Sequence, residues 1–422
     1  MDFTQFNSLD IPSQYDFGLH NNLLSEVSYP RSFSPTYFHK EVTPSSTITN
    51  QKSSGRCWMF AGLNMLRRSV ISEHNFPNSF EFSQSYLFFW DKLERMNYLI
   101  DTINDLKNSN LELDDREINH LLKDPFGDGG QWVMFENLVN KYGVVPKSVY
   151  PESFHSSNSR GVNMVLCQML RDYISKMYQG ENQDKVEFLK EVYLILVRFF
   201  GKPPSTFNFE YKNGKEIVSK EFTSHTFKDF CKINLDKYVS IVHDPRNDYS
   251  KLYSVKLLNN IVEGKKVKYL NLEMFRIKQL TKKSLDENSP VWFGSDVGQF
   301  FHRKTDMLDE EVFSYQKYLG LKLSLTKKDR METGESIPSH AMVFSGYHKD
   351  KFGKVDYWKI ENSWGKRGNY DGHLVCSDKW FQDFTYQVVI DRNYLKEEEI
   401  AIWESNTFSK ILPLWDPLGT LA

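Results

Sequence analysis

The cysteine at position 57 stands where a helix is predicted to begin, and that placement suits a nucleophile. Residues 58–68 carry apolar side chains at three- and four-residue steps and contain no proline, which favours an amphipathic helix. Ser53, Ser54 and Gly55 have the composition of a turn and helix cap. The positive end of a helix stabilises a thiolate, so the sequence predicts a lowered pKa for the Cys57 thiol. The alternative is that Cys57 is a small buried apolar residue, and partners elsewhere must decide between the two interpretations.

A cysteine nucleophile needs a base that takes its proton and returns it to the leaving group, and imidazole titrates in the useful range. Among the 11 histidines, His340 directly precedes the apolar run at residues 341–347, so a rigid strand would fix its ring. His373 opens a shorter run and is the nearest rival. Asn362 supplies an amide that can orient the base, and Trp364 supplies an indole that can shield their contact from water.

Two further stretches are candidates for contact with a substrate. Gln51 lies six positions before the cysteine and can offer a side-chain N–H to an oxyanion that forms beside the sulfur. Asp128, Gly129 and Gly130 form a glycine-rich turn that leads into a predicted helix. Glycines let the backbone approach a ligand closely, although most such turns are only turns.

The elements that must position these residues differ along the chain. Helical periodicity is predicted for residues 57–68, 82–98, 115–122, 132–141, 163–177 and 185–200. Asn213 and Gly214 then indicate a hairpin. Short β-type runs follow Pro290, at residues 291–297, 341–347, 357–362, 373–376 and 386–390. We therefore expect an α+β protein whose first third is mainly helical and whose last third is largely sheet.

Composition narrows the function classes. The chain has 422 residues and a formal net charge of −2, so its total charge does not favour nucleic acid or an anionic membrane as an obligatory partner. We find no secretory signal and no apolar stretch long enough to span a membrane. The 4 cysteines are scattered and no histidines cluster at metal-ligand spacing, so we expect no disulfide framework, no metal and no cofactor. The simplest compartment is the cytoplasm.

The motifs taken together resemble the bleomycin hydrolase branch of the papain-like cysteine peptidases. Gln51, Cys57, His340 and Asn362 occur in the order and settings of the papain-like family. Ser54 replaces a cysteine that secreted members use in a disulfide, and Arg56 replaces a small residue; both departures match the bleomycin hydrolase branch. The matching stretches are Gln51 to Trp58, Asp128 to Trp132, Pro290 to Gly294, His340 to Met342 and Glu361 to Gly365.

The resemblance implies a papain-like fold with a helical N-terminal half, a β-rich C-terminal half and a large, mainly helical insertion. The expected division is an N-terminal arm at residues 1–50, the helical half at 51–154, the insertion at 155–265, the β-rich half at 266–410 and a C-terminal arm at 411–422. By resemblance, the C-terminal arm lies in the active-site cleft, and the carboxylate of Ala422 faces the amine of the substrate.

The resemblance also implies the activity. It predicts a cysteine aminopeptidase that acts on peptides with free N-termini, extends to bleomycin-type amides and assembles as a homohexamer. Cys57 would attack the carbonyl, His340 would act as base and then acid, and Asn362 would orient His340. Gln51 and the backbone N–H of Cys57 would bind the oxyanion. Two alternatives are a ring-shaped protein that binds single-stranded nucleic acid and has secondary peptidase activity, and a catalytically dead relative.

Overall fold

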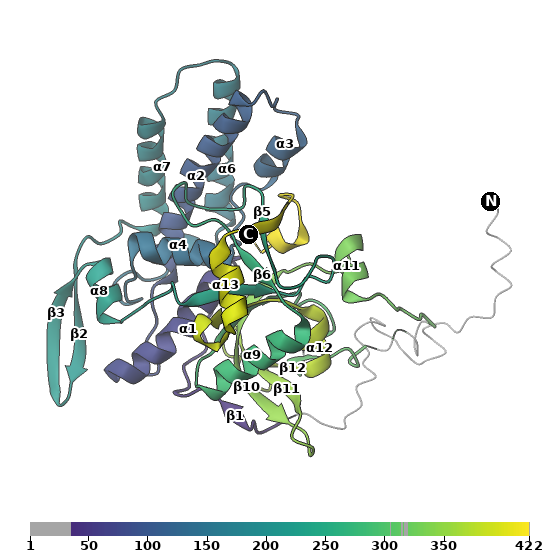
Figure 1. The fold of residues 1–422 in the computed structure, drawn as a ribbon. Coiled ribbons are helices and arrows are strands. Elements are labelled where there is room, and N and C mark those ends of the chain that lie inside the picture. Colours follow the sequence, from purple (N-terminus) through teal and green to yellow (C-terminus); the bar gives the residue numbers. More distant parts are fainter. Residues whose placement is uncertain (1–34, 304, 314, 316–319, 422) are drawn as a thin grey trace, which may run out of the picture.

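The computed structural model describes residues 35–421 except residues 304, 314 and 316–319. Most of the expected N-terminal arm, and Ala422, lie outside the described residues. Figure 1 shows a group of long helices packed beside a large sheet, with the C-terminal segment between them. The fold is α+β, as the sequence predicts.

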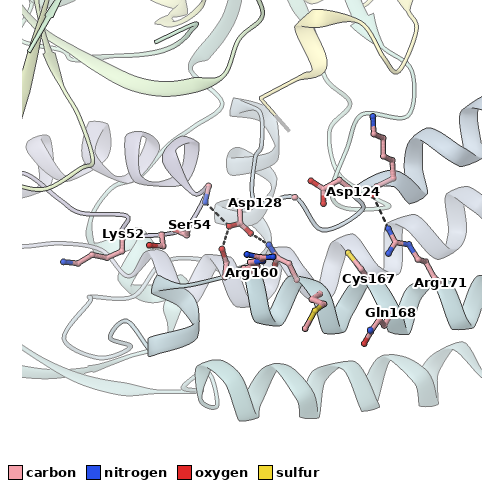
Figure 2. A pocket seen from close by; sticks show the side chains of 15 residues that line it. Lys52, Ser54, Asp124, Asp128, Arg160, Cys167, Gln168 and Arg171 are labelled. Carbon is pink, nitrogen blue, oxygen red and sulfur yellow. Dashed lines mark hydrogen bonds between the residues drawn. The ribbon is translucent and has the colours of Figure 1, made fainter. Parts of the chain in front are cut away.

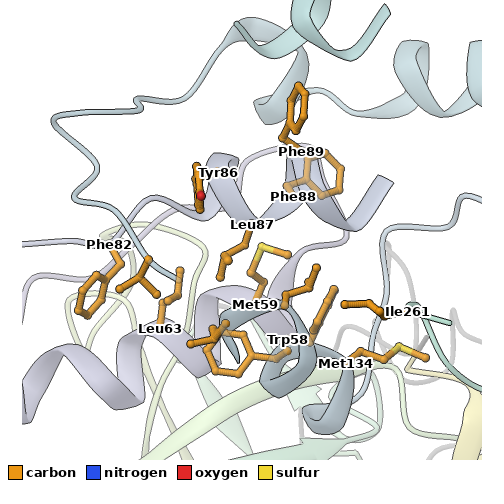
Figure 3. Close-up of a cluster of buried hydrophobic side chains, with 14 of the residues drawn as sticks. Trp58, Met59, Leu63, Phe82, Tyr86, Leu87, Phe88, Phe89, Met134 and Ile261 are labelled. Atoms are coloured by element: carbon orange, nitrogen blue, oxygen red, sulfur yellow. The ribbon is translucent and has the colours of Figure 1, made fainter. Parts of the chain in front are cut away.

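The helical part begins at Cys57, as predicted. Its helices are α1 (Cys57–His74), α2 (Gln84–Asn108), α3 (Arg116–Lys123) and α4 (Trp132–Tyr142). Trp58, Met59 and Leu63 of α1 are buried in one cluster with Leu87 of α2 and Met134 of α4, which Figure 3 shows in close-up. Burial of such large side chains supplies most of the free energy that holds the helices together.

The middle of the chain adds three helices and a hairpin before the next short helix. The elements are α5 (Phe154–Ser157), α6 (Arg160–Tyr178), α7 (Lys185–Phe200), β2 (Phe207–Asn213), β3 (Glu216–Phe222) and α8 (Ser224–Phe230). The predicted hairpin is confirmed, because β2 and β3 pair antiparallel from Asn213 and Glu216 outward. Helix α2 contacts α4, α6 and α7, so the middle helices extend the core of the first ones.

A sheet of 12 strands forms the other part of the molecule, in the order β14-β5-β6-β4-β13-β7-β10-β11-β12-β9-β8, with β1 on β10. Its central strands are β4 (Tyr238–Val242), β13 (Thr385–Asp391), β7 (Val291–Ser295), β10 (His340–Lys349) and β11 (Val355–Glu361). The remaining strands are β1 (Lys40–Glu41), β5 (Lys251–Val255), β6 (Tyr269–Asn271), β8 (Phe301–His302), β9 (Met307–Leu308), β12 (His373–Ser377) and β14 (Phe408–Leu412). All five β-type runs expected after Pro290 contain a strand.

The sheet also takes strands from the region that the sequence assigns to the insertion. β4 pairs antiparallel with β13, and β5 pairs antiparallel with β6. Both β4 and β5 lie before residue 265, so the stretch at residues 238–255 is part of the main sheet. The periodicity of so short a stretch does not show which partner it has, because β4 pairs with β13, more than 100 positions away.

Helices cover both faces of the sheet around its centre. Helix α1 contacts β10 and β7 on one face. Helix α9 (Met274–Asp286) contacts β7, β10 and β13, and α12 (Asp378–Phe384) contacts β11, β12 and β13. The other elements are α11 (Lys327–Thr333), η3 (Arg392–Tyr394), α13 (Glu397–Ser405) and η4 (Pro417–Gly419). The start of α1 therefore faces the first residues of β10.

Candidate active site

Cys57 is held at the start of α1 by contacts on both sides of it in the sequence. The backbone N–H of Gly55 donates to Oδ2 of Asp128 across 2.9 Å, and the indole N–H of Trp58 donates to the carbonyl of Asp128 across 2.7 Å. Arg56 is fully buried and pairs with both carboxylate oxygens of Glu152, at 3.1 and 2.9 Å. A charged and bidentate pair of this kind fixes geometry as well as energy. The loop before the sulfur is therefore held by contacts from Asp128 and Glu152.

The sulfur of Cys57 contacts the strand that carries His340. The backbone N–H of Ala341 donates to Sγ of Cys57 across 3.4 Å. Ala341 is the second residue of β10, and His340 is the first. The structure thus brings together two residues that are 284 positions apart in the sequence.

The imidazole of His340 is hydrogen-bonded to the side-chain amide of Asn362. Nε2 of His340 lies 2.9 Å from Oδ1 of Asn362. The same Oδ1 accepts the backbone N–H of Ser363 across 2.8 Å, which fixes the orientation of the amide. Because an amide oxygen only accepts, Nε2 carries a proton and Nδ1 is left as the basic nitrogen. His340 can therefore act as a base through Nδ1.

Trp364 shields the contact between the imidazole and the amide. Its ring stacks on that of His340 with centroids 4.8 Å apart and an interplanar angle of 30°. His340 and Asn362 are both at least 95% buried. Exclusion of water strengthens the hydrogen bond between them.

Burial shifts the pKa values of Cys57 and His340 in opposite directions. It raises the pKa of the Cys57 thiol to about 11, although the backbone N–H groups of Ala341, Trp58 and Cys57 act in the opposite direction. The sequence-based expectation of a lowered thiol pKa is therefore wrong for this structure, because desolvation outweighs the helix terminus. Burial also lowers the pKa of His340 to about 4, against the hydrogen bond with Asn362. Burial thus favours the neutral form of both the thiol and the imidazole.

Gln51 connects the cysteine loop to the asparagine loop. Its Nε2 donates to the carbonyl of Ser54 across 2.6 Å, and its Oε1 accepts from Oγ of Ser363 across 2.6 Å. Its backbone N–H also donates to the carbonyl of Ser363 across 2.8 Å. A primary amide has two N–H groups, so Nε2 of Gln51 keeps a second N–H that these contacts do not use.

Asp128 is engaged by protein groups. Besides Gly55, its carboxylate accepts from Ser159 and from Nδ2 of Asn163 at 2.7 Å, and it pairs with Lys92 at 3.0 Å. These partners hold its pKa well below the usual range even though burial acts in the opposite direction. Figure 2 shows Asp128 at the wall of a cavity of about 780 Å³, next to the Cys57 loop.

The two glycines after Asp128 are placed by different contacts. A side chain at Gly130 would lie 2.5 Å from the ring of Trp58, so only glycine allows this packing. The carbonyl of Gly129 accepts from Arg95. Contact of Asp128, Gly129 or Gly130 with a substrate stays a prediction.

Glu361 is a structural member of the site that the sequence analysis missed. Its carboxylate is fully buried and accepts from Arg67 across 2.9 Å and from Nε of Arg68 across 3.1 Å. Burial opposes its ionisation, but the guanidinium groups of Arg68 and Arg67 lower the pKa of Glu361 to about 2. This cluster joins α1 to the end of β11, next to Asn362. The signal in the sequence was a pair of arginines inside an otherwise apolar helix.

The C-terminal arm packs beside β7, the strand that pairs with β10 next to Cys57. Asp416 pairs with Arg246 at 2.9 Å, and the carbonyl of Leu418 accepts from Nε2 of Gln131 across 3.2 Å. Leu421 is 96% buried, and its Cδ1 lies so close to Gly294 that a β-carbon there would be 2.5 Å away. Gly294 is the partner of Ala341 in the pairing of β7 with β10. The arm therefore ends beside the strand that contacts the sulfur, and Ala422 lies outside the described residues.

The remaining sequence-based expectations concern metals, disulfides, membranes and the rival histidine. Among the described residues, no group of three or more His, Cys, Asp or Glu side chains could hold a metal ion, and all 4 cysteines are free. None of the described helices is long and apolar enough to cross a membrane. His373 opens β12, and its Nδ1 lies 3.2 Å from the carbonyl of Tyr370. It is not joined to Asn362.

Comparison with known proteins places the chain in a family. A model of the Peptidase C1-like family matches residues 19–419. Aminopeptidase C of Lactococcus lactis subsp. cremoris is 40% identical over 415 residues, which cover 95% of this chain and 93% of that protein. Human bleomycin hydrolase is 36% identical over 396 residues, covering 89% and 86% of the two chains. The crystal structure of PepW from Lactobacillus rhamnosus HN001 superposes with a TM-score of 0.86 at 39% identity, covering 92% and 89%. The chain belongs to the Peptidase C1-like family.

Proposed function

We propose that this protein is a cysteine aminopeptidase. The observation that carries the proposal is the joint placement of the thiol and an oriented imidazole. Nε2 of His340 is bound to Asn362 at 2.9 Å, and the next residue of the same strand donates to Sγ of Cys57 at 3.4 Å. A thiol, a base and a group that orients the base are the parts that nucleophilic catalysis by cysteine requires.

The proposed reaction follows from these positions. Nδ1 of His340 takes the thiol proton as Sγ of Cys57 adds to the carbonyl carbon of the scissile bond. The oxyanion accepts from Nε2 of Gln51 and from the backbone N–H of Cys57. The imidazolium then gives its proton to the leaving amine, and a thioester remains. Water, activated by the same imidazole, hydrolyses the thioester and restores the thiol.

The preference for free amino termini is assigned to the C-terminal arm. The burial of Leu421 and the contacts of Leu418 and Asp416 support an arm that occupies part of the cleft. In this proposal the carboxylate of Ala422, the residue after Leu421, attracts a protonated N-terminus. The relatives named Aminopeptidase C support this substrate class, and those named bleomycin hydrolase support hydrolysis of bleomycin-type amides.

Two variants test the function. Cys57→Ala should abolish turnover of aminoacyl fluorogenic amides, and full activity in this variant would eliminate the mechanism. Deletion of Leu421 and Ala422 should improve turnover of peptides with blocked amino termini relative to free ones. An unchanged preference would eliminate the role of the arm without affecting the role of Cys57.

The assembly and compartment are part of the same proposal. A homohexamer in the cytoplasm is supported by the resemblance, by the free cysteines and by large apolar side chains on the surface, such as Phe154 and Phe275. The relatives are named as peptidases or hydrolases, which does not favour the alternative of a nucleic-acid-binding ring. The mass in solution, measured by light scattering, tests the hexamer.

A further inference from the structure

The position of His340 depends on the segment that precedes it. Residues 336–339 connect the region after α11 to β10, and His340 is the first residue of that strand. Pairing with β7 fixes the backbone from His340 onward, and the backbone N–H of Ser339 also donates to the carbonyl of Ser295 across 2.9 Å. Asn362 and Trp364 hold the ring of His340, but a displacement of residues 336–339 would shift its backbone at the start of β10 and with it the ring.

Asp296 holds this segment from the inside of the protein. Its Oδ2 accepts from Oγ of Ser336 across 2.8 Å, and its Oδ1 accepts from Oγ of Ser339 across 3.2 Å. The hydroxyl of Tyr386 donates to Oγ of Ser336 across 2.6 Å, which leaves the serine proton for Asp296. Tyr386, Ser336 and Asp296 are all buried. The carboxylate thus anchors both ends of residues 336–339.

Thr420 of the C-terminal arm holds the same segment from the outside. Its Oγ1 lies 2.7 Å from the carbonyl oxygen of Pro338 and 2.8 Å from that of Pro417, and its single proton is shared between these two acceptors. The arm is fixed on either side of this contact, because the carbonyl of Leu418 accepts from Gln131 and Leu421 packs on Gly294. Because the arm is held at these other points, its contact with Pro338 restrains residues 336–339.

We propose that Asp296 and Thr420 are positioning residues for His340, and that the C-terminal arm therefore contributes to turnover as well as occupying the cleft. This inference rests on the peptidase function proposed above. It separates two roles of one arm: contact with the substrate belongs to the chain end, and support of the catalytic base belongs to Thr420.

Asp296→Asn tests the inner anchor. The amide puts an N–H₂ group in place of one carboxylate oxygen. If that group faces Ser336, the serine proton loses its acceptor, and if it faces Ser339, the same loss occurs there. We expect kcat to fall about tenfold with KM nearly unchanged, as the loss of one hydrogen bond to a charged group implies.

Thr420→Val tests the outer anchor with a matched series. Valine keeps the shape but removes the hydroxyl, whereas Thr420→Ser keeps the hydroxyl. We expect kcat to fall about threefold in the valine variant and to recover in the serine variant. Thr407→Val is the control, because the hydroxyl of Thr407 bonds only to the nearby carbonyl of Ser405 among the described residues. Thr420 is exposed, so its variants should fold.

Alkylation of Cys57 by iodoacetamide near neutral pH supplies a readout that does not need a substrate. A displaced His340 takes the thiol proton less readily, so Asp296→Asn and Thr420→Val should both slow alkylation, while the preference for free over blocked amino termini stays as in the parent protein. Normal kcat and normal alkylation in both variants would overturn the inference. If the parent protein turned over no peptide at all, the peptidase proposal would fail, and the alkylation rates would still decide whether Asp296 and Thr420 position His340.

Discussion

The indole N–H of Trp292 donates to the backbone carbonyl of Trp58 across 3.1 Å, which ties β7 to the first turn of α1. Both indoles are fully buried, and the ring of Trp132 lies against Trp292 with centroids 5.9 Å apart. The residue after the proposed nucleophile is thus fixed by a side chain from the sheet. This bond joins the helical and sheet parts of the molecule directly at the candidate site.

Trp292→Phe should lower the free energy of unfolding by about 2 kcal/mol, through the lost hydrogen bond and the space left by the smaller ring. Urea unfolding measures the change. Trp403→Phe is the control: Trp403 is partly exposed, so the expected change is within about 0.5 kcal/mol. Equal effects of the two variants would contradict the importance of the bond to Trp58.

Glu361→Gln should destabilise the protein by about 3–5 kcal/mol near neutral pH, because it leaves the buried guanidinium groups of Arg67 and Arg68 without their counter-charge. The pKa of Glu361 is lowered from 4.5 to about 2 in the folded protein. Its ionisation therefore stabilises the fold fully above about pH 4.5, and this contribution is lost as the pH falls through about 2.

The gap in unfolding free energy between the parent protein and Glu361→Gln should accordingly narrow by about 3 kcal/mol between neutral pH and about pH 2. Urea unfolding of both proteins across this range tests the sign. Glu398→Gln, on a side chain that is 72% exposed, should behave like the parent protein. A constant gap at all pH values would show that the charge of Glu361 is not what stabilises this cluster.

The acid limb of kcat/KM should lie near pH 4. The pKa of His340 is lowered to about 4 by burial, and a protonated imidazole cannot take the thiol proton. Activity should thus be retained as the pH falls below 6.5 and be lost as it falls through about 4. Initial rates with a substrate that lacks groups titrating in this range give the profile. An acid limb at pH 6.5 or above would contradict the lowering of the pKa of His340 by burial.

Gln51→Ala should lower kcat about 100-fold with a small change in KM, as expected when a donor to the oxyanion is removed. Ser363→Ala distinguishes the loss of the oxyanion donor from the loss of the contact that joins the two loops. It removes only the hydroxyl that binds Oε1 of Gln51, so we expect a decrease of about threefold. Equal losses in the two variants would indicate that Gln51 acts by holding the loops together.

Gly294→Ala should displace the end of the C-terminal arm, because the new β-carbon would lie 2.5 Å from Cδ1 of Leu421. We expect the ratio of turnover on blocked and free amino termini to rise, as in the deletion of Leu421 and Ala422. The two changes combined should give no further rise, since they act on the same contact. If the two changes raised this ratio additively, the packing of Leu421 against Gly294 would not be what sets the preference.

Local patterns in the sequence were sufficient for the parts of the site that depend on one element. The helix start at Cys57, the strand start at His340 and the amide at Asn362 each follow from a turn or a periodicity within about ten residues, and the family resemblance supplied their common order. Asn362 was a candidate partner of His340 because a base needs an orienting amide and because the family resemblance places one there.

The features that the sequence did not reveal depend on contacts between distant segments. The pKa of Cys57 depends on how deeply the helix terminus is buried, and Arg67 meets Glu361 from 294 positions away. The membership of β4 in the main sheet is likewise set by its pairing with β13. No periodicity within one segment reports such pairings, because they are decided by the packing of complete elements.

The contact between Ala341 and the sulfur has a consequence for synthesis. Cys57 leaves the ribosome 284 residues before Ala341, and translation at about 5–20 residues per second makes that interval on the order of tens of seconds. During this time the thiol has no base, no orienting amide and no covering indole. The growing chain therefore cannot hydrolyse peptide bonds through Cys57 before the strands from the last third are in place.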